Sequence, residues 1–489
     1  MLVEPDNPPS GRFAAFRPYS TFSMATPGQT FHVTAEFHAP PNAGVDLVGL
    51  EILAPEGWEV ESAGRHRFRV KVPNTATPTS AHWNRASVWD AAYRIRNDRW
   101  FGLPLPPAPL TGRATYRVAG IDVQAEQPAL TSFIDSTGVQ RRRTLVAGPA
   151  VSVSIPSEVG VLPIGLCRYR FTVAVRNNTS RAIEGEFRLE LSPGWRSTPD
   201  HAPFSFRQEG ETREILFDLT VPTGLPPGDY PVKAVASYDG IESRSSFERV
   251  TYPGLAAAYL SRPARHTVRV IDVKTAPRLK VGYVSGTGDD VPATIRQLGA
   301  AVELLDADAL AAGDLSAFDT IVLGIRAYAA RQDLKTHNQR LLDYVAQGGV
   351  LVVQYNAPEF DHDYGPYPYK MTRRPEEVSE EDSPVEILAP DDPVFNFPNR
   401  ITKRDFDGWV EQRGSKFLAE WDPRYRALLS THDQGQPPQK GGWLVARHGK
   451  GLYVYCAYAW YRQLPYAVPG AVRLFANLIS LGAPDAPWR

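Results

Sequence analysis

The chain has 489 residues, enough for about three domains of ordinary size. Lys and Arg total 53 against 54 Asp and Glu, so the formal net charge is -1 and no overall field attracts nucleic acid or an anionic membrane. No apolar run reaches the about 18 residues that a membrane-spanning helix needs, and the first thirty residues are rich in acids and prolines rather than basic and then apolar. We therefore expect no nucleic-acid partner, no membrane span and no signal peptide in this chain.

Cysteine and proline usage narrows the class further. The two cysteines, Cys167 and Cys456, are too few for a disulfide framework or a cysteine-based metal site, and each is expected to be a buried small apolar side chain rather than a reactive thiol. The 44 prolines are nearly twice the usual share and favour short strands and loops over long helices.

Residues 1–150 show the pattern of a β-sandwich. Apolar and polar residues alternate in Phe31–Phe37, His66–Val72 and Ala114–Val118, which predicts half-buried antiparallel strands. The proline-rich segment Leu103–Leu110 cannot lie in the centre of a sheet because proline has no N–H to donate. We expect it to cross the surface in an extended conformation.

Residues 151–272 repeat this pattern more clearly. Strands are predicted at Arg168–Val175, Glu186–Leu191, Glu214–Pro222 and Val232–Ala236. Their spacing and the turns between them predict an antiparallel, immunoglobulin-like sandwich.

Residues 273–489 change to alternating strands and helices. Because buried strands alternate with amphipathic helices, we expect a parallel sheet with crossover helices, followed by a hairpin near residues 443–455. The predicted strands are Leu279–Val284, Val302–Leu305, Thr320–Ile325 and Val350–Val353, and the predicted helices are Pro292–Leu298, 334–347 and 470–481.

Ligands of open α/β sheets bind at the carboxyl ends of the strands, so the residues that follow each strand are the candidates. Asp289 follows the first strand in a Gly-Thr-Gly-Asp-Asp sequence, which lacks the third glycine and the lysine of phosphate loops and is expected to be a tight turn with a helix cap rather than a nucleotide site. Arg326 and Tyr328 follow another strand. Arg326 is either a ligand for a carboxylate or sugar or the partner of Asp333 or Asp361.

The segment after Val350–Val353 holds the largest group of candidates. His362 between two carboxylates has the chemistry of a general base, and His432 lies in a loop that can fold back to the same strand ends. The alternative is an exposed loop in which the acids are merely solvated. No second histidine stands at ligand spacing, so we predict neither a metal site nor a cofactor. The candidate catalytic residues are Arg326, Asn356, Glu359, Asp361 and His362, and the candidate ligand-binding residues are Asp289, Tyr328, Tyr355, Tyr364 and His432.

Several strings of the third unit are similar to a known family. They include KVGYVSGTGDDVPATIRQLG, IVLGIRAYAARQDLKTHNQRLLDYVAQGGVLVVQYN and HGKGLYVYCAYAWYRQLPYAVPG. They resemble the carboxyl-terminal region of large bacterial PIG-L (LmbE-like) deacetylase-family proteins, which is similar to the class I glutamine amidotransferase-like fold of ThuA-like proteins. The sandwiches resemble the NEW-type modules associated with α-galactosidase. The resemblance thus implies two β-sandwiches at 1–150 and 151–272 and a flavodoxin-like α/β domain at 273–489.

The catalytic groups of these families do not carry over to this sequence. The His-Pro-Asp-Asp zinc motif of PIG-L deacetylases is absent, since the nearest string, at residues 390–393, has no histidine. The turn that holds the nucleophilic cysteine in amidotransferases carries Tyr355 and Asn356 here, and the later strand is followed by Cys456, Ala457 and Tyr458 instead of a histidine. Glutamine hydrolysis is therefore not expected.

We predict a non-catalytic accessory or assembly protein, associated with a PIG-L-type (N-acetylglucosaminyl) deacetylase or another carbohydrate-active system. Its degenerate third domain would bind a sugar or a partner subunit. Aromatic residues that can stack on sugar rings or fill the cores are Trp83, Trp89, Trp100, Tyr364, Tyr367 and Tyr369.

Other interpretations stay open at this point. One is a carbohydrate hydrolase that uses the polar residues at the strand ends. Another is a piece of a longer protein, or a subunit, that docks a PIG-L-type catalytic domain. Homo-oligomerisation also stays open, and so does location, since the resemblance is compatible with export to the periplasm or the cell exterior.

Overall fold

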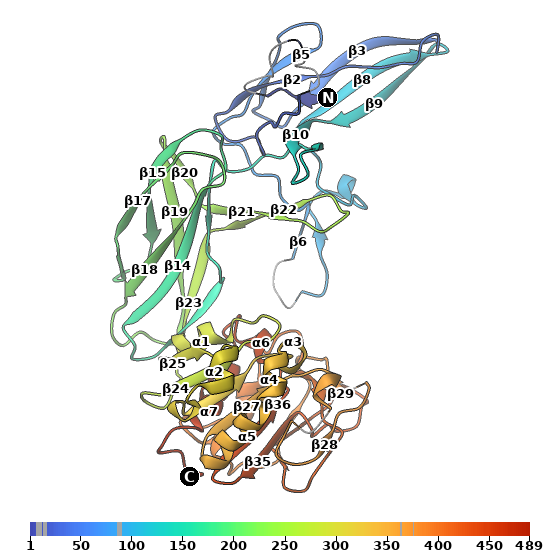
Figure 1. The fold of residues 1–489 in the computed structure, drawn as a ribbon. Coiled ribbons are helices and arrows are strands. Elements are labelled where there is room, and N and C mark those ends of the chain that lie inside the picture. The colour runs from blue at the N-terminus through green and yellow to red at the C-terminus, as the bar shows by residue number, and fades with distance from the viewer. Residues whose placement is uncertain (6–11, 13–16, 86–89, 362–363, 375) are drawn as a thin grey trace.

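The computed structural model describes residues 1–5, 12, 17–85, 90–361, 364–374 and 376–489, and of Glu359 only the backbone. The candidate His362 and the aromatic Trp89 lie outside the described residues. The molecule is mostly β-sheet and consists of three bodies in a row, with the helices gathered in the carboxyl-terminal one (Figure 1). Within the described residues, no helix combines the length and the apolar character needed to cross a membrane.

The N-terminal body has a six-stranded sheet and a separate three-stranded sheet that projects from it (Figure 1). Its small core includes Phe31, Val33 and Val70, and only the Ile52 end of the projecting sheet packs against it. The proline-rich segment Leu103–Leu110 contains no strand, as predicted. The six-stranded sheet has the order β11-β10-β1-β2-β5-β4, with β11 (Gln140–Thr144), β10 (Leu130–Ile134), β1 (Leu2–Val3), β2 (Thr30–Thr34), β5 (Arg67–Lys71) and β4 (Glu59–Ser62). The other strands are β3 (Val45–Leu53), β8 (Thr111–Val118) and β9 (Ile121–Pro128), with the short pair β6 (Trp83–Asn84) and β7 (Arg94–Ile95) and the turn η2 (Asp98–Trp100).

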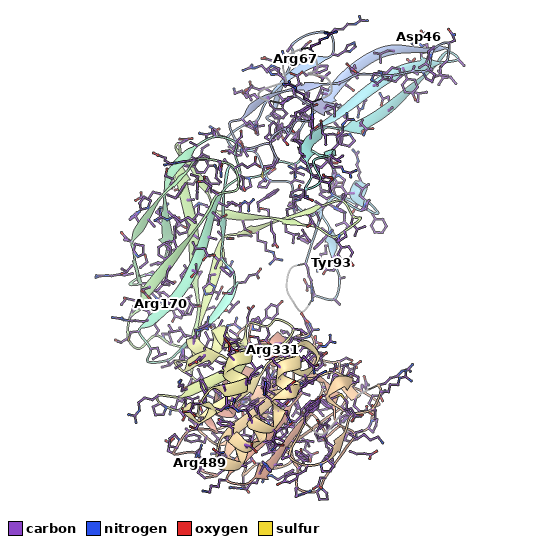
Figure 2. The ribbon with its side chains drawn as sticks, in the orientation of Figure 1. Asp46, Arg67, Tyr93, Arg170, Arg331 and Arg489 are labelled. Carbon is purple, nitrogen blue, oxygen red and sulfur yellow. The ribbon has the colours of Figure 1, made fainter. Side chains whose placement is uncertain are left out.

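The middle body is a sandwich of two sheets around its own core. The predicted alternation holds in β14, where Tyr169, Phe171 and Val173 are buried while Arg170 points outward to pair with Asp218 (Figure 2). One sheet contains β12 (Val151–Ser154), β14 (Arg168–Asn177), β18 (Thr212–Thr220) and β16 (Arg196–Thr198). The other contains β13 (Val159–Pro163), β23 (Arg265–Ile271), β19 (Gly228–Tyr238), β15 (Ile183–Glu190), β17 (His201–Phe206) and β20 (Ile241–Ser243).

The sequence predicts antiparallel sheets for these two bodies, but each body contains one parallel pair of strands. β13 pairs with β23 in parallel, and β1 pairs with β10 in parallel. In both pairs the two strands are far apart in sequence, so no tight hairpin fixes their relative direction. A separate hairpin, β21 (Ser245–Val250) and β22 (Ala258–Pro263), reaches from the middle body towards the N-terminal body (Figure 1).

The carboxyl-terminal body is built on a seven-stranded sheet with the order β25-β24-β26-β27-β36-β35-β33. The first five strands are parallel, β35 runs antiparallel to β36, and β33 pairs antiparallel with β35. The central strands are buried along their whole length, because helices cover the sheet. The strands are β24 (Lys280–Val284), β25 (Ala301–Leu304), β26 (Thr320–Leu323), β27 (Val350–Gln354), β33 (Arg426–Ala427), β35 (Trp443–His448) and β36 (Gly451–Cys456).

The helices of this body are short except for two. The helix predicted over 334–347 is divided, because His337 has a non-helical backbone (φ -104°, ψ 15°). The helices are α1 (Val291–Gln297), α2 (Ala307–Ala312), α3 (Ala327–Ala330), α4 (Gln332–Thr336), α5 (Asn338–Gln347), α6 (Trp460–Gln463) and α7 (Pro469–Ser480).

A long excursion separates β27 from β35; apart from β33, its described residues form small two-stranded sheets, 3-10 turns and loops. Its paired strands are β28 (Tyr369–Lys370) with β32 (Glu420–Trp421), β29 (Glu376–Val378) with β31 (Gly414–Phe417), and β30 (Val385–Ile387) with β34 (Leu429–Thr431). Its 3-10 turns include η4 (Pro358–Phe360), η5 (Pro393–Phe395) and η6 (Lys403–Phe406).

The middle and carboxyl-terminal bodies are joined by side-chain hydrogen bonds. Gln297 at the end of α1 accepts a hydrogen bond from the Val161 N–H (2.8 Å) and donates one to the Tyr169 hydroxyl (3.2 Å). Arg269 of β23 donates to the carbonyls of Tyr466 and Ala467. The surface between these two bodies, termed the seam below, is therefore a specific contact.

Candidate functional site

The loops that follow β24, β26 and β27 meet at the carboxyl edge of the sheet. The Thr287 N–H donates to the Ile325 carbonyl (3.0 Å), and the Arg326 N–H donates to the Tyr355 carbonyl (2.8 Å). Three of the segments chosen from the sequence are thus brought together, as the strand-end rule predicts.

Asp289 serves the fold at this edge. Its carboxylate accepts hydrogen bonds from the Tyr283 hydroxyl (2.6 Å) and from the Ile325 and Val291 N–H groups (both 3.3 Å). Burial and the neighbouring carboxylate raise the pKa of Tyr283, so it stays a neutral donor. Gly286 is needed because a Cβ there would lie 1.9 Å from the Ile325 carbonyl oxygen. These contacts explain the Gly-Thr-Gly-Asp-Asp sequence as a tight turn.

Asn356 and Tyr328 form a buried network between β27 and α3. Both are fully buried; the Tyr328 N–H donates to Asn356 Oδ1 (3.2 Å), and Asn356 Nδ2 donates to the Gln354 carbonyl (2.9 Å). The Tyr328 hydroxyl donates to Asn338 Oδ1 (2.6 Å), and the Tyr328 ring stacks on Tyr364 at 4.5 Å between centroids. Asn356 and Tyr328 therefore hold the loops after β27 and β26 together.

Among the candidates whose side chains the structure describes, Arg326 is the one with a buried side-chain nitrogen that lacks a hydrogen-bond partner. Its backbone is left-handed (φ 52°), and its Nε is buried without a hydrogen-bond partner among the described residues. Asp333 pairs with Arg331 instead (2.5 Å), and Asp361 accepts a hydrogen bond from the Met371 N–H (2.7 Å). Neither of the proposed partners thus forms an ion pair with Arg326 in the part of the chain that is described.

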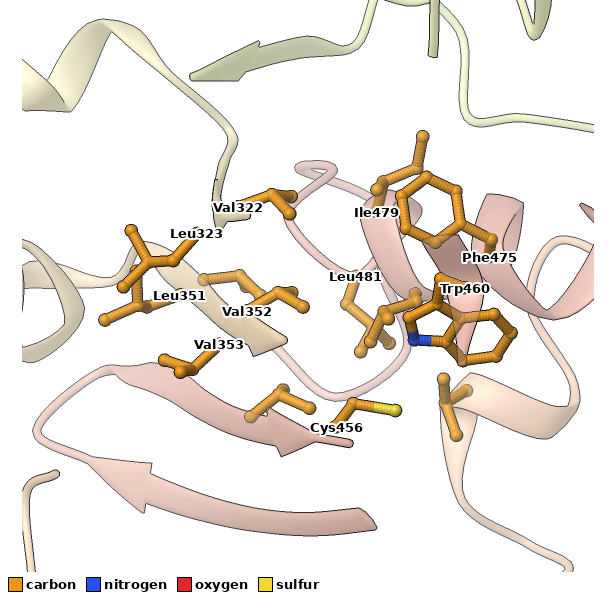
Figure 3. Packing of buried hydrophobic residues seen from close by; sticks show 14 of the residues in the cluster. Val322, Leu323, Leu351, Val352, Val353, Cys456, Trp460, Phe475, Ile479 and Leu481 are labelled. Atoms are coloured by element: carbon orange, nitrogen blue, oxygen red, sulfur yellow. The ribbon is translucent and has the colours of Figure 1, made fainter. Parts of the chain in front are cut away.

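His432 and Cys456 do not form a catalytic pair in this structure. The His432 ring bonds to the carbonyl of Asp433 (3.0 Å), and Asp433 itself anchors Ser379 and Ser383. Cys456 is fully buried, beside Trp460 in the apolar core (Figure 3). Burial raises the pKa of the Cys456 thiol well above its usual range, which disfavours the reactive thiolate.

This burial predicts a difference in thiol reactivity. We expect iodoacetamide to alkylate only Cys167, which is partly exposed, in the native protein, and both cysteines in denaturant. Mass spectrometry of the alkylated peptides measures this directly. Alkylation of native Cys456 at a rate near that of Cys167 would contradict the core position of the thiol.

A cavity of about 600 Å³ opens at the seam, next to the carboxyl edge of the sheet. Tyr461, in helix α6, stacks on Tyr355 (5.7 Å between centroids) and accepts a hydrogen bond from Gln412 Nε2 (2.7 Å), while Arg462 pairs with Glu411. Asp290, at the start of α1, connects this cavity to the strand-end loops. The cavity is lined by Arg85, Pro156, Ser157, Glu158, Arg262, Asp290, Glu411, Tyr461, Arg462, Pro465 and Tyr466.

The sequence analysis missed these lining residues. Tyr461 and Arg462 follow strand β36. Applying the strand-end rule to β36, in addition to β24, β26 and β27, would have indicated them. Ser157, Glu158 and Arg262 come from the middle body, and no pattern in the sequence shows that they face the sheet edge. No group of three or more His, Cys, Asp or Glu side chains close enough to hold a metal ion occurs among the described residues.

Comparison with known proteins places one segment of the chain. Residues 168–239 match the NPCBM-associated, NEW3 domain of alpha-galactosidase. This segment runs from β14 to the end of β19, the centre of the middle sandwich. No curated protein matches the sequence.

Solved structures share only parts of the architecture. A β-galactosidase from Rahnella sp. R3 aligns with 17% identity and a TM-score of 0.26 over 41% of this chain and 31% of that one. An exo-β-1,4-mannosidase from Opitutaceae bacterium strain TAV5 aligns with 12% identity and a TM-score of 0.26 over 42% and 35%. The match thus spans about a third of each of those enzymes, and TM-scores this low do not place the chain in either enzyme family.

Proposed function

We propose that this protein is a carbohydrate-binding accessory protein that acts without a covalent catalytic step and binds its sugar in the seam cavity. The observation that carries the proposal is the seam cavity itself, which lies beside a strand edge where the described candidate groups other than Arg326 Nε already bond to the protein or lie in its core. Asn356, Tyr328 and Asp289 bond to the protein, and Cys456 is in the core. The NEW3 match adds a carbohydrate-associated module to the same chain.

The chemistry of the seam cavity suits a sugar. Tyr461 and Tyr466 offer ring faces for the apolar C–H face of a pyranose, and Arg462, Glu411 and Asp290 offer donors and acceptors for its hydroxyls. The volume lies within the range of about 300–1,000 Å³ for small-molecule sites.

The domain division and the family resemblance belong to the same proposal. Three separate hydrophobic clusters support domains at 1–150, 151–272 and 273–489. The parallel order β25-β24-β26-β27-β36 supports a flavodoxin-like, class I amidotransferase-like third domain that has lost its nucleophile. A PIG-L-type deacetylase domain or subunit is the partner that the sequence resemblance implies.

A hydrolase is the second candidate, and one observation favours it. Arg326 combines a left-handed backbone with a buried Nε that has no hydrogen-bond partner among the described residues, and such strain and such unmet groups are often found at functional sites. In that case Arg326 would bind the substrate near Asn356, Glu359, Asp361 and His362.

Isothermal titration with a panel of neutral mono- and oligosaccharides tests the proposal. We expect Tyr461→Ala to weaken binding about fivefold, because an aromatic stacking contact contributes about 1 kcal/mol. Tyr252→Ala is the matched control, since Tyr252 is 70% exposed and does not line the cavity.

Three outcomes would reject parts of the proposal. Absence of heat with every sugar removes the binding function. Equal affinity in wild type and Tyr461→Ala moves the ligand out of the seam cavity. Release of reducing sugar that disappears in His362→Ala supports the hydrolase instead.

A further inference from the structure

A second and larger cavity, of about 700 Å³, lies between the N-terminal body and the β21–β22 hairpin. One wall is the proline-rich segment Leu105–Ala108, and the opposite wall is the end of the hairpin, Leu255–Tyr259. Strands β10 and β11 supply the floor with Phe133 and Arg143. We call this the hairpin cavity; it is separate from the seam cavity and shares no lining residue with it.

The hairpin cavity has an excess of positive charge. Arg142, Arg143 and Arg249 line it, and within the described residues none of the three forms an ion pair. Glu126 is the one acidic residue among the described lining, and it is already paired with Arg113 (2.7 Å). An anion held by Arg143 and Arg249 would therefore meet two guanidinium groups and no unpaired carboxylate of the described lining, since the Arg142 side chain points to the other face of β11.

Arg143 is the most constrained of these arginines. Its guanidinium lies over the Phe133 ring at 5.0 Å, and its Nε is buried without a hydrogen-bond partner in the described part of the chain. Burial is the largest effect on the pKa of Arg143 and lowers it, Tyr259 opposes this, and smaller effects come from Arg249, which lowers the pKa, and Glu209, which raises it. Holding a partly buried guanidinium without a carboxylate costs folding free energy, and an unmet donor of this kind calls for a ligand as its explanation.

The neighbouring Arg141 shows the ordinary arrangement on the same strand. It pairs with Asp135 at 2.9 Å on the surface and does not line the hairpin cavity. Arg141 and Arg143 face the same side of β11. Across the strand pair, Arg141 is the register partner of Phe133 in β10, and Arg143 is the partner of Thr131. Arg141 therefore shows that an arginine of this strand can pair with a carboxylate at the surface, whereas the buried Nε of Arg143 has no partner among the described residues.

We propose that the hairpin cavity binds a carboxylated sugar of the uronic-acid class, with its carboxylate on Arg143. A guanidinium matches a carboxylate with two parallel N–H···O bonds, which would meet the Nε donor. Phe133, Tyr259 and the prolines give apolar faces for the C–H side of the ring, and Thr111 and Thr144 give hydroxyls at its edges. This inference does not depend on the seam cavity binding anything.

Titration of the full chain with D-glucuronic acid, D-glucose, glucose 6-phosphate and benzoate tests the ligand class. We expect glucuronic acid to bind, with an affinity that falls as salt rises, and glucose to bind at least tenfold more weakly. Equal binding of glucose would overturn the charge argument, and tighter binding of glucose 6-phosphate or benzoate would overturn the uronic-acid assignment. Absence of binding by glucuronic acid would overturn the proposal as a whole.

Arg143→Met, with Arg141→Met as the matched control, tests the residue. Methionine keeps the apolar contact with Phe133 but removes the charge, so we expect at least a tenfold loss of glucuronic-acid affinity together with a melting temperature a few degrees higher in the unliganded protein. Arg141→Met should neither weaken glucuronic-acid binding tenfold nor raise the melting temperature. A lower melting temperature or failure to fold in Arg143→Met would show a structural arginine and overturn the proposal, as would unchanged affinity.

Discussion

Replacing Asn477 by alanine is expected to destabilise the carboxyl-terminal body by roughly 3–5 kcal/mol, because about 1–3 kcal/mol is lost for each buried polar group left unpaired. Asn477 is fully buried on α7, whose other buried residues are apolar or small except for Ser480. Its Oδ1 accepts from the N–H and the side-chain amide of Asn399 (2.9 and 2.7 Å), and its Nδ2 donates to the carbonyls of Val394 and Asn399 (2.8 and 2.7 Å). This side chain bonds the excursion after β27 to helix α7.

Urea unfolding followed by tryptophan fluorescence measures this effect, since Trp409, Trp443 and Trp460 all lie in the same core. Asn396→Ala is the matched control, because Asn396 is an exposed asparagine of the same excursion and also bonds to two carbonyls. We expect the control to cost less than about 1 kcal/mol. Similar losses in the two variants would show that Asn477 is not the anchor.

Stability of the middle sandwich is expected to fall as the pH drops below about 6.5, with a slope of up to about 1.4 kcal/mol per pH unit, because of His266. This histidine is fully buried between the Tyr169 hydroxyl (2.8 Å from Nε2) and the Ser157 carbonyl (2.7 Å from Nδ1). Burial lowers the pKa of His266, against a smaller opposing effect of its hydrogen bond to Ser157. The folded protein therefore holds it neutral, while acid protonates it in the unfolded chain, so stability is complete above the unfolded pKa and is lost below it.

The free energy of unfolding measured between pH 5 and pH 8 checks this prediction. His266→Gln should be less stable overall but should lose the part of the pH slope that belongs to the histidine. His201→Gln, at an exposed position on β17, should keep the wild-type slope. Identical slopes in the wild type and His266→Gln would contradict the prediction. Both hydrogen-bond partners of His266 also belong to the seam. Tyr169 bonds to Gln297 of α1, and Ser157 lines the seam cavity.

The identity and direction of most elements follow from local patterns in the sequence. The alternation in Arg168–Val175 fixes which side of β14 is buried, because side chains of a strand point to opposite faces in turn. The apolar run Val350–Val353 predicts a strand buried on both faces, as β27 is. The absence of a nucleophile at Tyr355 and Asn356 is likewise visible without a structure.

The sequence predicts that several candidate residues lie at one edge of the sheet, but it does not predict which of them are free to bind a ligand. The strand-end rule brought Asp289, Arg326 and Asn356 to one edge, yet hydrogen bonds that depend on distant partners make Asp289 and Asn356 parts of the fold. Arg326 alone kept an unmet donor there, which no local pattern could show. The roles of Glu359 and His362 stay predictions, because the Glu359 side chain and all of His362 lie outside the described residues.

The sequence by itself determined most of the strands and helices, because each depends on residues that are close to one another along the chain. Tertiary structure alone decided the two cavities. The seam cavity joins Glu158 to Tyr461, and the hairpin cavity joins Phe133 to Tyr259, residues that are far apart along the chain. Contacts of this kind arise when separately folded sheets pack together, and the periodicity of a strand records only which side is buried and not what covers it.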